Sequence, residues 1–346
     1  MKELIDKLYQ TQALDKEELI FLIAGRNRDT ELYARELARQ VRERTYGNRV
    51  FMRGLIEFTN YCKNDCYYCG IRRSNKNAAR YRLTKEDILD CCRQGYDLGF
   101  RTFVLQGGED GYFTKERLTD LICQIKETYA DCALTLSVGE KSEAEYRAFR
   151  EAGADRYLLR HETADKDHYR ILHPEPLSLE NRKHCLETLK KIGFQTGAGF
   201  MVGSPGQTPE TLAEDFLFLK NLDPEMVGIG PFISHGDTPF RDKADGTLED
   251  TLFYLALLRL MLPGVLLPAT TALGTIHPSG RELGILSGAN VVMPNLSPLS
   301  VRKKYMLYDG KISTGDEAAE GIKNLKKRME TIGCQIVTDR GDYYKK

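Results

Sequence analysis

Short apolar runs alternate with longer amphipathic segments along the chain from about residue 54 onward. The short runs are rich in β-branched residues and have the length of strands, whereas the longer segments repeat apolar residues at helical spacing. We expect strands at 54–59, 102–106, 133–138, 156–160, 195–203, 225–232, 265–271 and 290–295. We expect helices after these strands at 84–99, 114–129, 142–153, 178–193, 208–222, 247–262, 279–288 and 317–333.

Repeated strand–helix units of this number predict an α/β protein with a (β/α)8 barrel of the TIM type. A doubly wound open sheet is the alternative, but such sheets commonly stop at about six parallel strands. The segment before the first strand shows helical patterns, and it would pack on the barrel or cap its bottom. We therefore expect N-terminal helices in residues 1–50, the barrel in residues 51–333 and a C-terminal tail in residues 334–346.

Composition narrows the class of protein. The chain has 50 Lys and Arg against 50 Asp and Glu, so its bulk charge does not indicate a nucleic-acid partner. The long apolar run at 256–269 is interrupted by Arg259, Pro263 and Gly264, and we expect no membrane span. Nine cysteines, an odd number, without a signal-peptide pattern indicate reduced thiols, so we expect a cytoplasmic protein.

The chemistry of a (β/α)8 barrel takes place at the C-terminal ends of its strands. The first strand runs into "TNYCKNDCYYCGIRR" (59–73), which places Cys62, Cys66 and Cys69 within eight residues. A closed structural zinc site needs four ligands, so three cysteines would leave a zinc ion with an open position. An iron–sulfur cluster held by three thiolates would leave one iron open to another ligand. The residues alone therefore support two hypotheses, a zinc-binding interaction module and an iron–sulfur enzyme.

The spacing C-x3-C-x2-C, with Tyr68 as the aromatic residue before the last cysteine, resembles the signature of the radical S-adenosylmethionine superfamily. The resemblance implies a 4Fe–4S cluster held by Cys62, Cys66 and Cys69, with S-adenosylmethionine bound to the fourth iron. In this family, one electron from the cluster cleaves the sulfonium and yields a 5′-deoxyadenosyl radical. The radical forms at the cofactor, so no protein residue is assigned as a catalytic acid or base.

Other strand ends carry motifs that match the same superfamily. "QGGED" (106–110) resembles the glycine-rich segment that binds the methionyl amino group, and "RHET" (160–163) places Arg160 and Glu162 on one side of an extended segment. "MVGIGPF" (226–232) would lay its backbone along the adenine. The resemblance implies a cofactor-binding set of Tyr68, Gln106, Gly107, Gly108, Glu109, Arg160, Glu162, Arg182 and Ile229.

Within the superfamily, the chain is most similar to the branch that contains biotin synthase, methylornithine synthase and the HydE family of FeFe-hydrogenase maturases. "ADRYLLRHETA", "MVGIGPFISHGDTP" and "PATTALGTI" resemble the HydE family in particular. This resemblance implies a step in building the di-iron active-site cluster, on a small-molecule or organometallic iron–cysteine substrate. It also implies companion maturases of the scaffold and tyrosine-lyase types, and an electron donor such as ferredoxin or flavodoxin. A radical mutase like methylornithine synthase, acting on an amino acid such as lysine, is the alternative.

A substrate would occupy the barrel below the cluster. Thr135 and Ser137 point to one face of the third strand, and Thr270 and Thr271 end the seventh. The expected substrate-binding set is Arg53, Thr135, Ser137, Met226, Thr270, Thr271, Met293 and Tyr305. Some relatives carry a second cysteine cluster near the last barrel helix. Because only Cys334 lies in this C-terminal region, we expect one 4Fe–4S cluster per chain.

Overall fold

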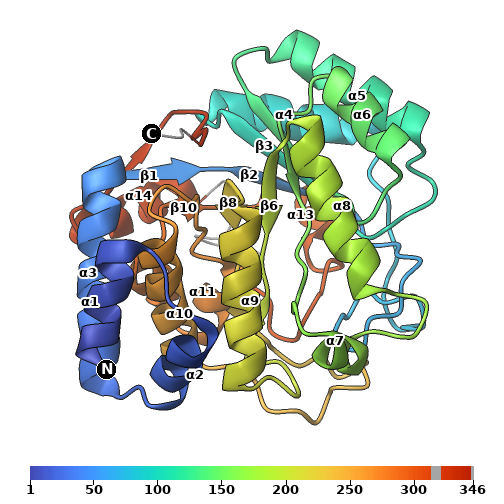
Figure 1. Cartoon of the computed structure of the whole chain (residues 1–346). Helices are drawn as coiled ribbons and strands as arrows, with labels where there is room; N and C mark the ends of the chain where they lie inside the picture. The colour runs from blue at the N-terminus through green and yellow to red at the C-terminus, as the bar shows by residue number, and fades with distance from the viewer. Residues whose placement is uncertain (313–320, 344–346) are drawn as a thin grey trace.

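A ring of parallel strands surrounded by helices forms the body of the protein in the computed structural model, which describes residues 1–312 and 321–343 (Figure 1). Six strands pair in the order in which they occur along the chain, all in parallel. They are β2 (Gly54–Thr59), β3 (Thr102–Gly107), β4 (Ala133–Ser137), β5 (Arg156–Leu158), β6 (Gln195–Ala198) and β8 (Met226–Val227).

Isolated parallel bridges close this sheet into a barrel. Met226 pairs with Leu266, Pro268 pairs with Val291 of β10 (Val291–Val292), and Leu55 pairs with Asn295. The seventh expected strand is thus present as bridges at 266 and 268 and not as a continuous ladder, because Pro268 has no amide hydrogen to donate. The expected (β/α)8 barrel is confirmed.

Two expected strands are each split. Residues 195–203 form β6 and β7 (Met201–Val202), and residues 225–232 form β8 and β9 (Gly230–Pro231). The break in the first falls at Gly199, whose φ is +149° and whose added Cβ would lie 2.0 Å from the Gly228 carbonyl oxygen. β7 and β9 then pair with each other above the main sheet.

The helices around the barrel begin largely where the sequence offers capping residues. The Thr84, Ser142 and Thr208 side chains each accept a hydrogen bond from the backbone three residues later. The barrel helices are α4 (Lys85–Asp97), α5 (Lys115–Thr128), α6 (Glu143–Glu151), α7 (Lys166–Leu172), α8 (Leu179–Ile192), α9 (Pro209–Leu222), α10 (Leu248–Met261), α11 (Thr271–Ile276), α12 (Gly280–Leu286), α13 (Leu299–Arg302) and α14 (Ile322–Thr331). The start of the helix expected at 317–333 lies outside the described residues.

Three helices precede the barrel: α1 (Lys2–Thr11), α2 (Lys16–Ala24) and α3 (Arg28–Tyr46). They lie along the side of the barrel against α9 and α10 (Figure 1). Lys16 pairs with Glu214 of α9, and Arg26 pairs with Asp250 of α10. These contacts place the three helices against the outer helices of the barrel.

The C-terminal tail covers the bottom of the barrel. β11 (Gln335–Val337) pairs with β1 (Arg49–Met52), which precedes β2. Beyond it, the Arg340 carbonyl oxygen accepts hydrogen bonds from Thr102 and Arg156, which begin β3 and β5. Asp342 pairs with the buried Arg156 guanidinium at 2.7 Å. The tail therefore bridges the N-terminal ends of several strands and closes the floor.

Within the described ranges, no helix is both long and apolar enough to cross a membrane.

Candidate functional site

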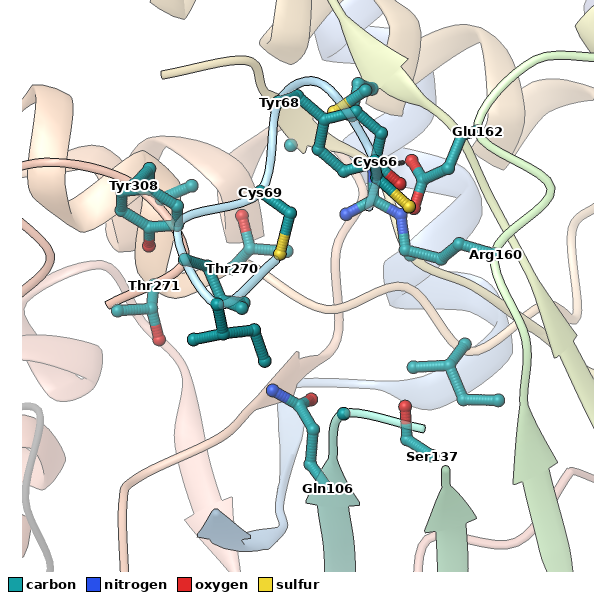
Figure 2. Close-up of a pocket in the computed structure, with 18 of the residues that line it drawn as sticks. Cys66, Tyr68, Cys69, Gln106, Ser137, Arg160, Glu162, Thr270, Thr271 and Tyr308 are labelled. Atoms are coloured by element: carbon teal, nitrogen blue, oxygen red, sulfur yellow. Dashed lines mark ion pairs between the residues drawn. The ribbon is translucent and has the colours of Figure 1, made fainter. Parts of the chain in front are cut away.

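A cavity of about 370 Å³ opens at the C-terminal ends of the strands. Its wall includes all three cysteines of the segment 62–69, together with residues that follow most of the strands. Figure 2 shows Cys66 and Cys69 on this wall. Of the expected site residues, the cavity is lined by Cys62, Cys66, Tyr68, Cys69, Gln106, Gly107, Gly108, Glu109, Ser137, Arg160, Glu162, Arg182, Thr270, Thr271, Met293 and Tyr305. The structure thus brings together side chains that are up to 243 positions apart in the sequence.

The segment that carries the cysteines, residues 60–80, is held by its own polar side chains. Arg80 donates to the carbonyl oxygens of Asn60, Ile71, Arg72 and Asn75. The Gly70 amide donates to the Leu307 carbonyl oxygen at 2.8 Å, which fixes the segment to a second one that crosses the barrel mouth. We call residues 303–311 the strap. These contacts shape the cysteine segment.

The three thiols are partly buried and electrostatically unfavourable as thiolates on their own. Burial raises the pKa of Cys66 to about 12, and the neighbouring Cys62 sulfur adds to the rise. Burial also raises the pKa of Cys62 and Cys69. Cationic iron would offset this cost, since metal binding deprotonates its thiol ligands.

The positions of the three sulfurs bear on whether they hold a single zinc ion or an iron–sulfur cluster. Among the residues that the structure describes, no three His, Cys, Asp or Glu side chains are grouped to hold a single metal ion. In a 4Fe–4S cluster each cysteine binds a different iron, so the sulfurs surround a volume and do not meet at one point. Three thiols on the wall of one cavity fit such a cluster.

The glycines after β3 allow the cysteine segment to approach closely. A Cβ on Gly108 would lie 2.2 Å from the Tyr61 carbonyl oxygen, so only glycine fits there. Glu109 next to it is buried, accepts a hydrogen bond from the Glu140 amide at 3.0 Å and pairs with Lys63 at 3.1 Å. Glu109 therefore ties the ends of β3 and β4 to the cysteine segment.

Arg160 and Glu162 form an ion pair that projects into the cavity (Figure 2). Arg160 Nη2 lies 2.9 Å from Glu162 Oε2, yet neither atom has a well-aligned hydrogen bond. Burial raises the pKa of Glu162, and the two arginines Arg160 and Arg182 oppose that rise. Buried polar atoms without partners are costly, so such atoms bind a water, an ion or a ligand. An ammonium and a carboxylate, as on the methionyl end of S-adenosylmethionine, would complete them.

Arg182 has a supporting position beside this pair. Its Nε donates to Glu140 Oε1 and its Nη1 donates to the Arg160 carbonyl oxygen, both at 2.5 Å. Arg182 therefore holds the backbone of the Arg160–Glu162 segment while its side chain reaches the cavity wall.

Glu162 has a positive φ of +64°, which is strained for a residue with a side chain. The adjacent His161 is fully buried, accepts a hydrogen bond from the Gly199 amide at 3.2 Å and lies 3.3 Å from Asp215. Burial lowers the pKa of His161 and raises that of Asp215, and the two side chains pack together behind the segment. These contacts of His161 hold the adjacent Glu162 in its strained backbone conformation.

Tyr68 lines the cavity between the second and third cysteines. Its hydroxyl lies 3.3 Å from His173 Nε2 after α7, and the two rings meet edge to face. Burial raises the pKa of the Tyr68 hydroxyl well above its usual range, so it stays protonated.

Four expected residues do not reach the cavity wall. The Ile229 side chain is fully buried, and its neighbours Gly228 and Gly230 line the cavity instead. Arg53, Thr135 and Met226 are buried and are not part of the wall, and Arg53 Nη1 lies 3.0 Å from Met226 Sδ. Strand alternation identified Thr135 and Ser137 as facing the same way but could not show that the wall begins only at Ser137, two residues nearer the strand end.

Sequence reasoning also missed cavity residues. Glu57, Lys311 and Tyr308 line the wall without having been assigned. A single charged residue inside the fully buried strand "GLIEFT" was a usable signal for Glu57. Lys311 lies in a segment without periodicity, and nothing local marks it.

The profile of the Radical SAM superfamily matches residues 56–219, which contain the cysteine segment and the strand ends up to β7. The chain is 45% identical to the [FeFe] hydrogenase maturase subunit HydE of Thermotoga maritima, over 98% of this chain and 97% of that protein. It is 30% identical to 3-methylornithine synthase of Methanosarcina barkeri, over 95% and 92% of the two chains.

Solved structures agree in fold. Methylornithine synthase (PylB) superposes with a TM-score of 0.86 at 29% identity, over 96% of this chain and 97% of that one. HydG, a maturase of the [FeFe]-hydrogenase, superposes with a TM-score of 0.79 at 19% identity, over 95% and 74%, which shows a shared fold.

These similarities define a radical S-adenosylmethionine enzyme, with a 4Fe–4S cluster and S-adenosylmethionine as its cofactors. Methylornithine synthase is the more distant relative by sequence. Within the superfamily, the chain belongs to the HydE family and has a radical role in FeFe-hydrogenase maturation.

Proposed function

We propose that Cys62, Cys66 and Cys69 hold the 4Fe–4S cluster and that the Arg160–Glu162 pair binds the methionyl end of S-adenosylmethionine. The observation that carries this assignment is that the three thiols and the incompletely bonded ion pair share one cavity. When bound, the cluster and its cofactor supply a one-electron cleavage that yields a 5′-deoxyadenosyl radical. The protein residues orient the cofactor within the cavity, and the strap lies beside the cysteine segment at its mouth.

The substrate would lie deeper in the same cavity. Ser137, Thr270, Thr271, Met293 and Tyr305 line it, and Gln106 reaches the Tyr305 hydroxyl at 3.5 Å. We assign to this part an iron-bound cysteine or a related small molecule, on the resemblance to the HydE family. Three further expected residues lie behind the side chains that line the cavity: Arg53, Thr135 and Met226. They would contact a ligand only if those lining side chains moved aside.

The chain acts alongside other hydrogenase maturases. We propose that its companions are of the scaffold and tyrosine-lyase types, that ferredoxin or flavodoxin delivers the electron, and that the pathway operates in the cytoplasm. The direct test is anaerobic maturation of a metal-free FeFe-hydrogenase with purified companions. Hydrogen evolution should require this chain with its cluster and S-adenosylmethionine. Full hydrogenase activity without it would refute the assignment.

An amino-acid mutase is the second candidate, and the 30% identity to 3-methylornithine synthase over nearly the whole chain favours keeping it. The two functions differ in the molecule that triggers cofactor cleavage. If L-lysine stimulates 5′-deoxyadenosine formation and thiol-containing amino acids do not, the mutase function holds. The reverse result supports the maturase function.

A further inference from the structure

A second pair of opposite charges lies in the wall of the cavity. Lys311 Nζ lies 2.6 Å from Glu57 Oε1, and the side chains are 5% and 0% exposed. Asn295 donates to Glu57 Oε2 at 2.8 Å, and Lys311 also donates to the Tyr305 carbonyl oxygen at 3.1 Å. Both charged residues line the cavity.

This pair lies across the barrel from Arg160 and Glu162. Glu57 belongs to β2 and Asn295 follows β10, whereas the Arg160–Glu162 segment follows β5, three strands from β2 around the ring. Each pair consists of one cation and one carboxylate. The cavity therefore offers two separate places where an α-amino acid group could bind.

The second ion pair is not needed to hold the strap in place. The strap is already fixed by the Gly70–Leu307 hydrogen bond and by two hydrogen bonds of Asp309 with Ser234 and Gly236, at 2.9 and 2.8 Å. A buried ion pair adds little stability, because desolvation offsets the attraction between the charges. Charged groups that face a cleft are a common feature of binding and catalytic sites.

Both partners keep unused bonding capacity. An ammonium has three donors, and two of those on Lys311 are used. A carboxylate has about four acceptor positions, and the Glu57 oxygens accept from Lys311 and Asn295. One donor and further lone pairs can therefore meet a carboxylate and an ammonium.

We propose that Lys311 and Glu57 form a subsite for the α-amino acid group of the substrate, with Lys311 binding its carboxylate and Glu57 its amine. The proposal rests on the proposed function, in which the amino acid group of S-adenosylmethionine occupies the Arg160–Glu162 pair. A second amino acid then needs a second pair of charges, and Glu57 and Lys311 supply it.

The experiment uses the anaerobic enzyme with its cluster and S-adenosylmethionine, and measures binding of three thiols by calorimetry. L-Cysteine carries both charges, cysteamine lacks the carboxylate, and 3-mercaptopropionate lacks the amine. Lys311→Met should lower the affinity for L-cysteine and for 3-mercaptopropionate by about tenfold or more, as expected for loss of one charge-assisted hydrogen bond. The affinity for cysteamine should not change. Glu57→Gln should instead lower the affinity for L-cysteine and for cysteamine.

Lys304→Met is the matched control, because Lys304 lies in the same strap with an exposed side chain, and it should change none of the affinities. The double variant Glu57→Gln/Lys311→Met leaves no unpaired buried charge and should fold with full iron content, yet lose all preference for L-cysteine. Three results would each overturn the subsite. They are an equal loss of affinity for all three thiols, unchanged affinities, and no binding of L-cysteine by the native enzyme. Failure to mature a hydrogenase, with this selectivity intact, would refute the proposed function only.

Discussion

The Gly70 amide donates a hydrogen bond to the carbonyl oxygen of Leu307 at 2.8 Å, and this bond joins the cysteine segment to a strap more than two hundred residues later in the chain. The contact is tight on both sides of the glycine. A Cβ at Gly70 would lie 2.2 Å from the Met306 carbonyl oxygen and 2.3 Å from His235 Cδ2. The cover of the cavity and the proposed cluster ligands are thus one packed unit.

Gly70→Ala should loosen this unit. The added methyl group meets a backbone oxygen that cannot turn away, so we expect a loss of about 1–3 kcal/mol in the free energy of unfolding. Iron content after reconstitution and the thermal midpoint report the effect. Gly111→Ala is the control, since no atom lies within 4 Å of its added Cβ. Equal behaviour of the two variants would contradict the packing argument.

Cys69→Ala should abolish cofactor cleavage and leave the fold intact. With two remaining thiolates the cluster loses one of its three proposed protein ligands, and 5′-deoxyadenosine formation should fall below detection. Cys123→Ala, on α5 and not on the cavity wall, should keep both cluster and activity. A Cys69→Ala protein that still formed 5′-deoxyadenosine would exclude the ligand assignment.

Iron content tests the number of clusters. We expect about four irons per chain after anaerobic reconstitution, because one 4Fe–4S cluster is assigned. A broad absorption and brown colour should accompany them. About eight irons per chain would indicate a second cluster, and a colourless protein with one zinc per chain would support the zinc-binding module.

Glu162→Gln should weaken S-adenosylmethionine binding without removing the cluster. The substitution keeps the shape but removes the charge that we pair with the cofactor's amine, so we expect a loss of about tenfold or more in affinity. Equilibrium binding to the reconstituted enzyme measures it. Glu187→Gln, exposed on α8, is the matched control. Unchanged affinity together with unchanged iron would show that Glu162 only supports the strained turn.

Asp342 should make the floor of the barrel sensitive to acid. Burial opposes its ionisation, but hydrogen bonds from Arg340 and Arg156 outweigh that effect and lower its pKa to about 2. Because the folded-state pKa lies below the ordinary value, its stabilisation is complete above about pH 4 and is lost as pH falls toward 2. Asp342→Asn should cost about 1–2 kcal/mol at pH 7 and nothing near pH 2. Unfolding of the metal-free protein by urea, at both pH values, measures the difference, and a cost that does not change with pH would contradict it.

Patterns that repeat along the sequence predicted the barrel well. Strands and helices such as 102–106 and 208–222 carry their own periodicity and capping residues, so local sequence is enough to place them. The three cysteines stand out because their spacing is itself the chemical signal. Depth in the barrel could not be predicted in this way, since Thr135 and Ser137 share a face but only Ser137 meets the cavity.

Contacts between distant segments account for what the sequence did not indicate. The strap and the tail have little regular structure, and their positions follow from partners such as Leu307 with Gly70 and Asp342 with Arg156. The Glu57–Lys311 pair is of the same kind, because its two members are 254 positions apart. Only the folded chain shows that these groups meet.

The sealed floor has a kinetic consequence. Because the tail bridges the starts of β3 and β5, molecules reach the cavity from the mouth. There Cys66, Cys69, Tyr68 and Glu162 lie above Gln106 and Ser137 (Figure 2). A substrate that binds at the strand ends and S-adenosylmethionine must then pass through the same entrance. A shared entrance would appear as slower substrate binding when the cofactor is already in place, with no change in the affinity at equilibrium.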